Sequence, residues 1–198
     1  MELSVLYGMT ITPAMVARVL NDAGVKYVLA GAHATNAHTG RPRARQDVDV
    51  LTDAPKQAAA ALLAAFPQLE PRDSPVVTRL LIDGREAVDV MKARQSKLFC
   101  RVVRMAQPVT IDGVPVAVPA IEGMLAMKFA SMISVGRQEE DRFVDASDFI
   151  KLIKAADALQ VPVDLDRLRE LGDLVYDGGG TEIVRHADDV RAGRPMQI

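Results

Sequence analysis

The chain has 198 residues, of which 49% are hydrophobic, and its formal net charge is −2. This length suits one domain, or a core domain with a small appendage, and it is ample for a full hydrophobic core. The slightly negative charge excludes a bulk electrostatic attraction to nucleic acid, so any such contact has to come from a local patch.

The cysteine content and the hydropathy pattern restrict the compartment. The single cysteine, Cys100, excludes an intrachain disulfide and fits a reducing environment. No apolar stretch approaches the length of a membrane span, and the N-terminus lacks a basic region followed by an apolar one. We therefore expect a soluble, cytoplasmic protein without membrane contact.

The first part of the chain alternates between helical and strand patterns. Thr12-Pro13 is a favourable helix start, Gly24 a favourable stop, and Gly31 ends a short apolar run. The pattern predicts helices over 12–22, 33–38 and 54–65, with strands over 27–30 and 47–52 between them.

Two tight turns, Asp83-Gly84 and Asp112-Gly113, predict two β-hairpins in the middle of the chain. Pro115 cannot donate to a strand ladder, which indicates that its strand lies at an edge. The predicted strands cover 76–82, 87–91, 109–111 and 114–118, and a predicted helix over 96–105 separates the two hairpins.

After Pro119 only helical patterns remain, and they predict helices over 121–135, 139–155, 164–176 and 181–191. The run Gly178-Gly179-Gly180 predicts a flexible break before the last helix. We therefore expect a core over residues 1–118 and a helical C-terminal region over residues 119–198 that packs on this core.

Three carboxylates occupy outward positions in the predicted strands. Side chains alternate between the two faces of a strand, so Asp47 and Asp49 point the same way while Val48 faces the core. Asp89 holds the matching outward position in a later strand. Three carboxylates on one sheet face would repel and raise each other's pKa, and a divalent cation removes this penalty. The grouping therefore predicts a metal site.

An Asp-x-Asp pair alone is a weak motif, and the chain contains a second one. Asp164-Leu165-Asp166 precedes a helical pattern, where acids cap amide groups and suit the helix dipole, so we interpret it as a cap. Asp47 and Asp49 instead lie in a β-branched apolar run, where a buried unpaired charge is costly. The competing interpretation is that they are solvated strand-edge acids and that Gly31 merely ends a strand.

Four segments together resemble the nucleotidyltransferase superfamily shared with polymerase β, and within it the AbiEii-type small bacterial nucleotidyltransferases. The matching segments are Gly31-Ala32, Arg43 to Leu51, Val88 to Met91, and Lys128 with the later helix Asp145-x-x-Asp148. The likeness covers roughly residues 11 to 155. It implies an α/β (α+β) fold, with a small mixed β-sheet nucleotidyltransferase core, flanking helices and a helical C-terminal part.

The resemblance also implies a chemistry. Asp47 and Asp49 would hold two Mg²⁺ ions against a nucleoside triphosphate, and Asp89 would activate the attacking hydroxyl as a general base or as a metal ligand. Gly31, followed by Ala32, would let backbone amides of the next helix approach the departing phosphates. The implied activity moves a nucleoside monophosphate to a hydroxyl acceptor and releases pyrophosphate.

The chain departs from the family pattern at two positions. The family usually has Gly or Ser where Ala32 stands, and relatives often have Thr at the position of Arg45. Either change can tune substrate choice, or it can mark a member that binds nucleotide without transferring it. Arg43 and Arg45 allow two interpretations, contact with triphosphate or nucleic acid, or a solvated loop.

The helical part contributes further candidates. The resemblance favours phosphate or acceptor binding by Lys128. Asp141, Asp145 and Asp148 share one helix stripe, for which a solvated acidic face is the ordinary interpretation, although the resemblance supports Asp145 and Asp148 as site residues. Lone histidines such as His33 and His38 are more often structural.

The resemblance suggests a toxin of a toxin–antitoxin or phage-defence pair, with tRNA or another RNA as acceptor and an antitoxin protein as partner. An aminoglycoside-type nucleotidyltransferase with a small-molecule acceptor is the enzymatic alternative. A non-catalytic nucleotide-binding or partner-binding domain is the other alternative.

Overall fold

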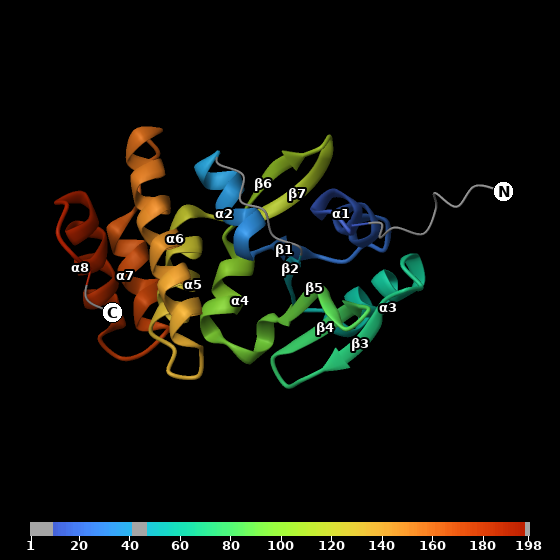
Figure 1. The fold of residues 1–198 in the computed structure, drawn as a ribbon. Helices are drawn as coiled ribbons and strands as arrows, with labels where there is room; N and C mark the ends of the chain where they lie inside the picture. The colour runs from blue at the N-terminus through green and yellow to red at the C-terminus, as the bar shows by residue number, and fades with distance from the viewer. Residues whose placement is uncertain (1–9, 41–46, 197–198) are drawn as a thin grey trace.

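A five-stranded mixed β-sheet forms the centre of the fold in the computed structural model, which describes residues 10–40 and 47–196 (Figure 1). The strand order is β1-β2-β5-β4-β3. β2 and β5 are parallel, whereas all other neighbouring strands are antiparallel. The strands are β1 (Tyr27–Leu29), β2 (Val48–Thr52), β3 (Glu70–Asp73), β4 (Val77–Ile82) and β5 (Arg85–Lys92).

Helices flank this sheet, and between residues 120 and 196 the regular elements are all helices. The α5–α8 helices lie together at one end of the molecule, and α2 and α4 lie between them and the sheet (Figure 1). A short helix η1 (Ala93–Gln95) follows β5, and a separate hairpin of β6 (Ala106–Ile111) and β7 (Val114–Pro119) precedes α5. The α-helices are α1 (Pro13–Asp22), α2 (Gly31–Thr39), α3 (Pro55–Ala65), α4 (Lys97–Arg104), α5 (Ile121–Met132), α6 (Glu139–Ala158), α7 (Leu165–Asp173) and α8 (Gly179–Arg191).

Local sequence signals account for several element boundaries. The Thr12 hydroxyl accepts a hydrogen bond from the Met15 amide at 3.3 Å, and the Asp164 carboxylate accepts one from the Arg167 amide at 3.0 Å. Both are N-caps that satisfy amide groups at a helix start. Asp83 and Gly84 have φ values of 50° and 74°, as a two-residue hairpin turn requires. The predicted caps and the first hairpin are therefore confirmed.

Two features differ from the sequence-based expectation. β3 was not predicted, because its four residues are all exposed and include Pro71, which an edge strand tolerates. The predicted flexible break at the glycine run is wrong. Gly179 and Gly180 are buried in the first turn of α8, and a Cβ atom on Gly179 would overlap the Gly172 carbonyl oxygen of α7. These glycines let the two helices pack closely.

One continuous apolar core joins the sheet to the helices. It runs from α1 to α8 and includes the fully buried side chains of Val50, Leu80, Val88, Leu125 and Phe149. Burying each such side chain contributes about 1.5–3 kcal/mol to folding. The division between residues 118 and 119 stays a prediction. Within residues 10–40 and 47–196, no helix combines the length and the apolar character needed to cross a membrane.

Candidate active site

Two aspartates lie side by side on the two parallel strands. Asp49 of β2 is in register with Asp89 of β5, next to the pairs Val48–Val88 and Val50–Val90. The four valines are buried, whereas both aspartates are partly exposed. Because alternate side chains point to opposite faces, both carboxylates lie on the face away from these valines. The predicted alternation of core-facing Val48 and Val50 with outward Asp49 is confirmed.

Most of the predicted site residues line one pocket of about 400 Å³. Asp47, which precedes β2, lines it together with Asp49 and Asp89. Gly31 and Ala32, at the start of α2, line the same pocket. The five positions come from the start of α2, from β2 and the residue before it, and from β5, and the fold brings them together.

Burial perturbs the Asp89 carboxyl. Its pKa is raised to about 6, mainly by loss of hydration and also by the negative charges of Glu86 and Asp47, while the positive charge of Arg79 partly offsets these effects. Asp89 Oδ1 is buried without a hydrogen-bond partner. The group is therefore poised to exchange a proton near neutral pH or to meet a cation.

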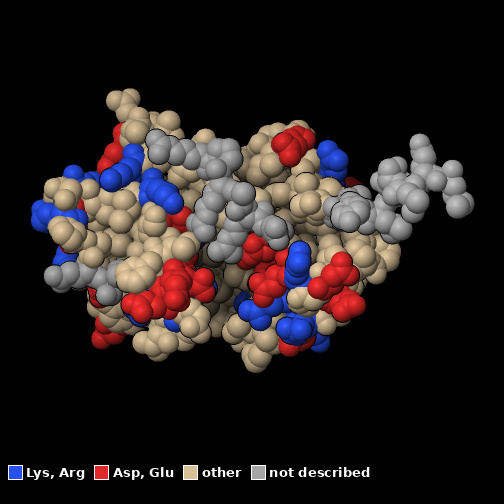
Figure 2. Space-filling view, viewed as in Figure 1, with Lys and Arg blue, Asp and Glu red and all other residues tan. Residues whose placement is uncertain are grey.

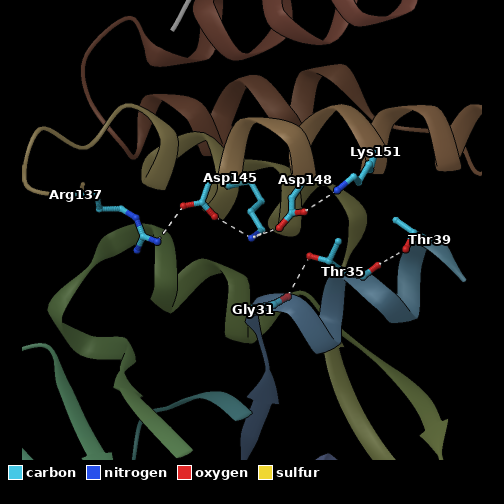
Figure 3. Close-up of polar contacts among 8 residues, drawn as sticks. Gly31, Thr35, Thr39, Arg137, Asp145, Asp148 and Lys151 are labelled. Carbon is cyan, nitrogen blue, oxygen red and sulfur yellow. Dashed lines mark hydrogen bonds and ion pairs between the residues drawn. The ribbon is translucent and has the colours of Figure 1, made fainter. Parts of the chain in front are cut away.

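Gly31 brings the backbone against the Asp49 carboxylate. Its φ of 58° lies in the left-handed region, and a Cβ atom there would overlap Asp49 Oδ2 and lie 2.7 Å from Asp49 Cγ. The Thr35 hydroxyl donates a hydrogen bond to the Gly31 carbonyl at 3.1 Å, which ties the first turn of α2 together (Figure 3). Ala30, the N-cap residue of α2, makes no side-chain cap. This helix start therefore faces the pocket with backbone groups.

A buried ion cluster forms the opposite wall. Lys128 Nζ of α5 donates to Asp145 Oδ1 at 2.9 Å and to Asp148 Oδ2 at 2.8 Å, both on α6. Arg137 Nη2 lies 3.2 Å from Asp145 Oδ2, and Lys151 Nζ lies 3.6 Å from Asp148 Oδ1 (Figure 3). The interpretation of these acids as a solvated face is wrong for Asp145 and Asp148, because both side chains are buried. The positive charge of Lys128 offsets the cost of burying their carboxylates.

Acidic side chains also lie at the mouth of this pocket. Asp141 is exposed and lines it from the start of α6, and the exposed Glu86 lines it from β5. Acids gather on both sides of a hollow between the helical end of the molecule and the sheet (Figure 2). Among the described residues, this pocket is lined by seven carboxylates and three cations.

Sequence reasoning missed three charged pocket residues, Arg79, Glu86 and Arg137. Arg79 Nε lies 2.8 Å from Glu86 Oε1 and 3.7 Å from Asp89 Oδ2. Arg79 lies opposite Asp89 in the β4–β5 ladder only because the register shifts between Leu80 and Leu81, so counting residues from the hairpin turn could not have found it. No sequence signal pointed to Arg137.

The remaining candidates include two arginines and a histidine. Arg43 and Arg45 lie outside the described residues. His38 Nε2 lies 2.8 Å from the Pro119 carbonyl oxygen, a contact that supports the structural interpretation of this histidine. Burial lowers the His38 pKa.

The oxygen-rich donor set fits a hard cation such as Mg²⁺. Asp89 Oδ1 has no hydrogen-bond partner, and carboxylate oxygens are the ligands that this ion prefers. In the described part of the chain, no group of three His, Cys, Asp or Glu side chains is arranged to hold an ion by itself. Mg²⁺ commonly takes one or two carboxylates together with substrate phosphates, so the residues fit an ion that binds along with a triphosphate.

No family model and no curated protein matches this sequence. Solved structures do match. An antigenic nucleotidyltransferase-like protein from Paracoccidioides brasiliensis has a TM-score of 0.56 at 19% identity, covering 93% of this chain and 91% of that chain. ANT(2'')-Ia in complex with adenylyl-2''-tobramycin has a TM-score of 0.51 at 14% identity, covering 90% and 94%. JHP933 from Helicobacter pylori has a TM-score of 0.50 at 17% identity, covering 91% and 90%.

These comparisons confirm the predicted fold class. The chain has a nucleotidyltransferase-like fold with a mixed sheet, and identities below one in five carry the likeness no further than the fold. The AbiEii-type assignment stays a prediction.

Proposed function

We propose that this protein is a Mg²⁺-dependent nucleotidyltransferase that moves a nucleoside monophosphate from a nucleoside triphosphate to a hydroxyl acceptor. The observation that carries the proposal is the registered pair of Asp49 and Asp89 on adjacent parallel strands, with Gly31 packed against Asp49. Solved nucleotidyltransferase-like proteins of the same fold support this class of reaction.

The chemical step is a substitution at the α-phosphorus. The acceptor hydroxyl oxygen forms a bond to this phosphorus, while the bond to the oxygen that bridges to the β-phosphate breaks. Pyrophosphate leaves with the electron pair, and the hydroxyl proton passes to the Asp89 carboxylate. A pKa of about 6 lets Asp89 be ionised at neutral pH and still accept a proton as the bond forms.

The other residues bind and orient. Asp47 and Asp49 would hold Mg²⁺, which when bound neutralises charge on the phosphate oxygens. The backbone amides at the start of α2, at Gly31 and Ala32, would approach the departing phosphates because a helix N-terminus favours anions. Asp89 would either bind the metal as well or act only as general base on the acceptor hydroxyl.

Two acceptor classes follow. The excess of seven carboxylates over three cations in the pocket favours a small cationic acceptor over the phosphates of RNA, because like charges repel in a partly buried site. One solved protein of similar fold, ANT(2'')-Ia, is in complex with adenylyl-2''-tobramycin, an adenylylated small molecule. The resemblance instead favours tRNA or another RNA and a role as a toxin with an antitoxin partner. Arg43 and Arg45 would serve such an RNA.

A thermal-shift experiment tests the metal and nucleotide site. Mg²⁺ with a triphosphate should raise Tm, because a ligand that binds only the native state stabilises it. The double variant Asp47→Asn with Asp49→Asn should keep the fold and lose the rise. An equal rise in the double variant would contradict the assignment of these two aspartates.

A transfer assay tests the activity. The protein is incubated with each labelled triphosphate and with either total RNA or a set of aminoglycosides, and label on the acceptor is measured. Asp89→Asn should still bind Mg²⁺-triphosphate but transfer label at least ~100-fold more slowly, the usual scale for a lost general base. Binding without transfer by the wild type would favour a non-catalytic nucleotide-binding domain instead.

A further inference from the structure

Three cationic side chains of the described residues line the candidate active site, namely Arg79, Lys128 and Arg137. A triphosphate carries several negative charges, so each of these cations is a candidate to contact it. Lys128 is much less exposed than the two arginines, whose side chains are 39% and 41% exposed, and the arginines differ in how many carboxylates already hold them. These differences indicate which one can change partner.

Lys128 is held firmly by the protein itself. Its Nζ contacts Asp145 at 2.9 Å and Asp148 at 2.8 Å, and its side chain is 11% exposed. Both aspartates are buried, so moving Lys128 toward a phosphate would deprive two buried carboxylates of the cation that they share. The lysine is therefore a positioning residue that fastens α5 to α6, which differs from the phosphate contact that the resemblance implies.

Arg79 is also engaged by two carboxylates. Its Nε lies 2.8 Å from Glu86 and 3.7 Å from Asp89, across the β4–β5 ladder. Moving Arg79 would remove the positive charge that opposes the two acids beside it. This arginine belongs to the carboxylate group on the sheet.

Arg137 differs from both. Its Nη2 atom pairs with Asp145 Oδ2 at 3.2 Å, and its side chain is 41% exposed. The other oxygen of Asp145 already accepts from Lys128, so Asp145 keeps a cation when Arg137 leaves. Arg137 lies on the connection between α5 and α6, where residues 135–138 are all exposed, so little packing holds this part of the connection in place.

We infer that Arg137 is the side chain that binds the β- and γ-phosphates and the pyrophosphate that leaves with them, exchanging Asp145 for these anions. The inference rests on the proposed function, because it assigns a phosphate-binding residue to that same pocket. A guanidinium group offers parallel N–H donors that match phosphate oxygens, which an ammonium group does not. Asp145 is the partner that holds Arg137 ready when no nucleotide is bound.

Calorimetric titration of the full chain with inorganic pyrophosphate and Mg²⁺ tests this role without any transfer reaction. Arg137→Ala should bind pyrophosphate about 10- to 100-fold more weakly, the range for a lost charge-assisted hydrogen bond. Arg137→Lys should recover part of the loss. The matched control is Lys151→Ala, since Lys151 pairs with the same cluster through Asp148, is 53% exposed and lies outside the pocket lining. Its affinity should stay within about twofold of wild type.

The outcomes separate this inference from the proposed function. Wild-type affinity in Arg137→Ala, or equal losses in Arg137→Ala and Lys151→Ala, would overturn the inference while transfer activity continued to support the proposed function. Conversely, a wild type that binds pyrophosphate through Arg137 but labels no acceptor would uphold the inference and end the proposed function.

Discussion

Replacing Gly31 with alanine tests the closest contact in the candidate site. The new Cβ atom would overlap Asp49 Oδ2 and lie 2.7 Å from Asp49 Cγ, so the carboxylate has to move. The matched control is Gly40→Ala at the other end of α2. Gly40 has a φ of 63°, close to the 58° of Gly31, but a Cβ atom there would meet nothing within 4 Å.

The magnitude follows from two contributions. An alanine in the left-handed region costs about 1–2 kcal/mol at either glycine, offset by about 0.4–1 kcal/mol through the less flexible unfolded chain. Overpacking against Asp49 adds about 1–3 kcal/mol at Gly31 alone. We therefore expect Gly40→Ala to cost about 1 kcal/mol and Gly31→Ala about 2–4 kcal/mol.

Urea denaturation measures both costs, and the Mg²⁺-triphosphate thermal shift measures the site. Gly31→Ala should lose most of the shift because Asp49 is displaced, whereas Gly40→Ala should keep it. Combining Gly31→Ala with Asp49→Ala should recover about 0.5–3 kcal/mol as a coupling energy, since the overlapping carboxylate is gone. Equal costs at the two glycines, with the thermal shift intact in both, would refute the close approach of Gly31 to Asp49.

Lys128→Met should lower the free energy of unfolding by about 3–5 kcal/mol, because it leaves two buried carboxylates without their shared lysine. The control Lys151→Ala should change this free energy by less than about 0.5 kcal/mol. Similar values for the two variants in urea denaturation would contradict the buried cluster. Burial lowers the pKa of His186 in the folded protein. The stability that the neutral His186 side chain contributes is therefore complete above the unfolded-state pKa, near 6.5, and is lost as the pH falls through the lower folded-state pKa. His186→Phe should flatten this pH dependence of Tm, and an unchanged slope would argue against His186 as its cause. Asp164→Ala should cost about 1 kcal/mol by removing a helix cap, and a comparable cost for Asp166→Ala, which makes no such cap, would count against that explanation.

Local features of this protein follow from the sequence alone. The alternation of Val48, Asp49 and Val50 predicts which side chains face the core, because the period of a strand is two. The Asp83-Gly84 turn predicts its hairpin because few residues adopt positive φ at both turn positions. Asp164 predicts a helix start because its side chain can satisfy a free amide. Each of these effects acts over a few residues, so no knowledge of the rest of the fold is needed.

Partners that are distant in the chain required the tertiary structure. Counting back from the hairpin turn would place Thr78 opposite Asp89, but an irregularity between Leu80 and Leu81 shifts the register and places Arg79 there instead. Lys128 lies 17 and 20 residues from the aspartates that it neutralises, and helical periodicity alone predicts those acids on a solvated face. The pairing of β2 with β5 likewise depends on how helices and sheet pack around it. Sequence patterns determine which way a side chain points along its own element, whereas the packing of separate elements decides what it meets.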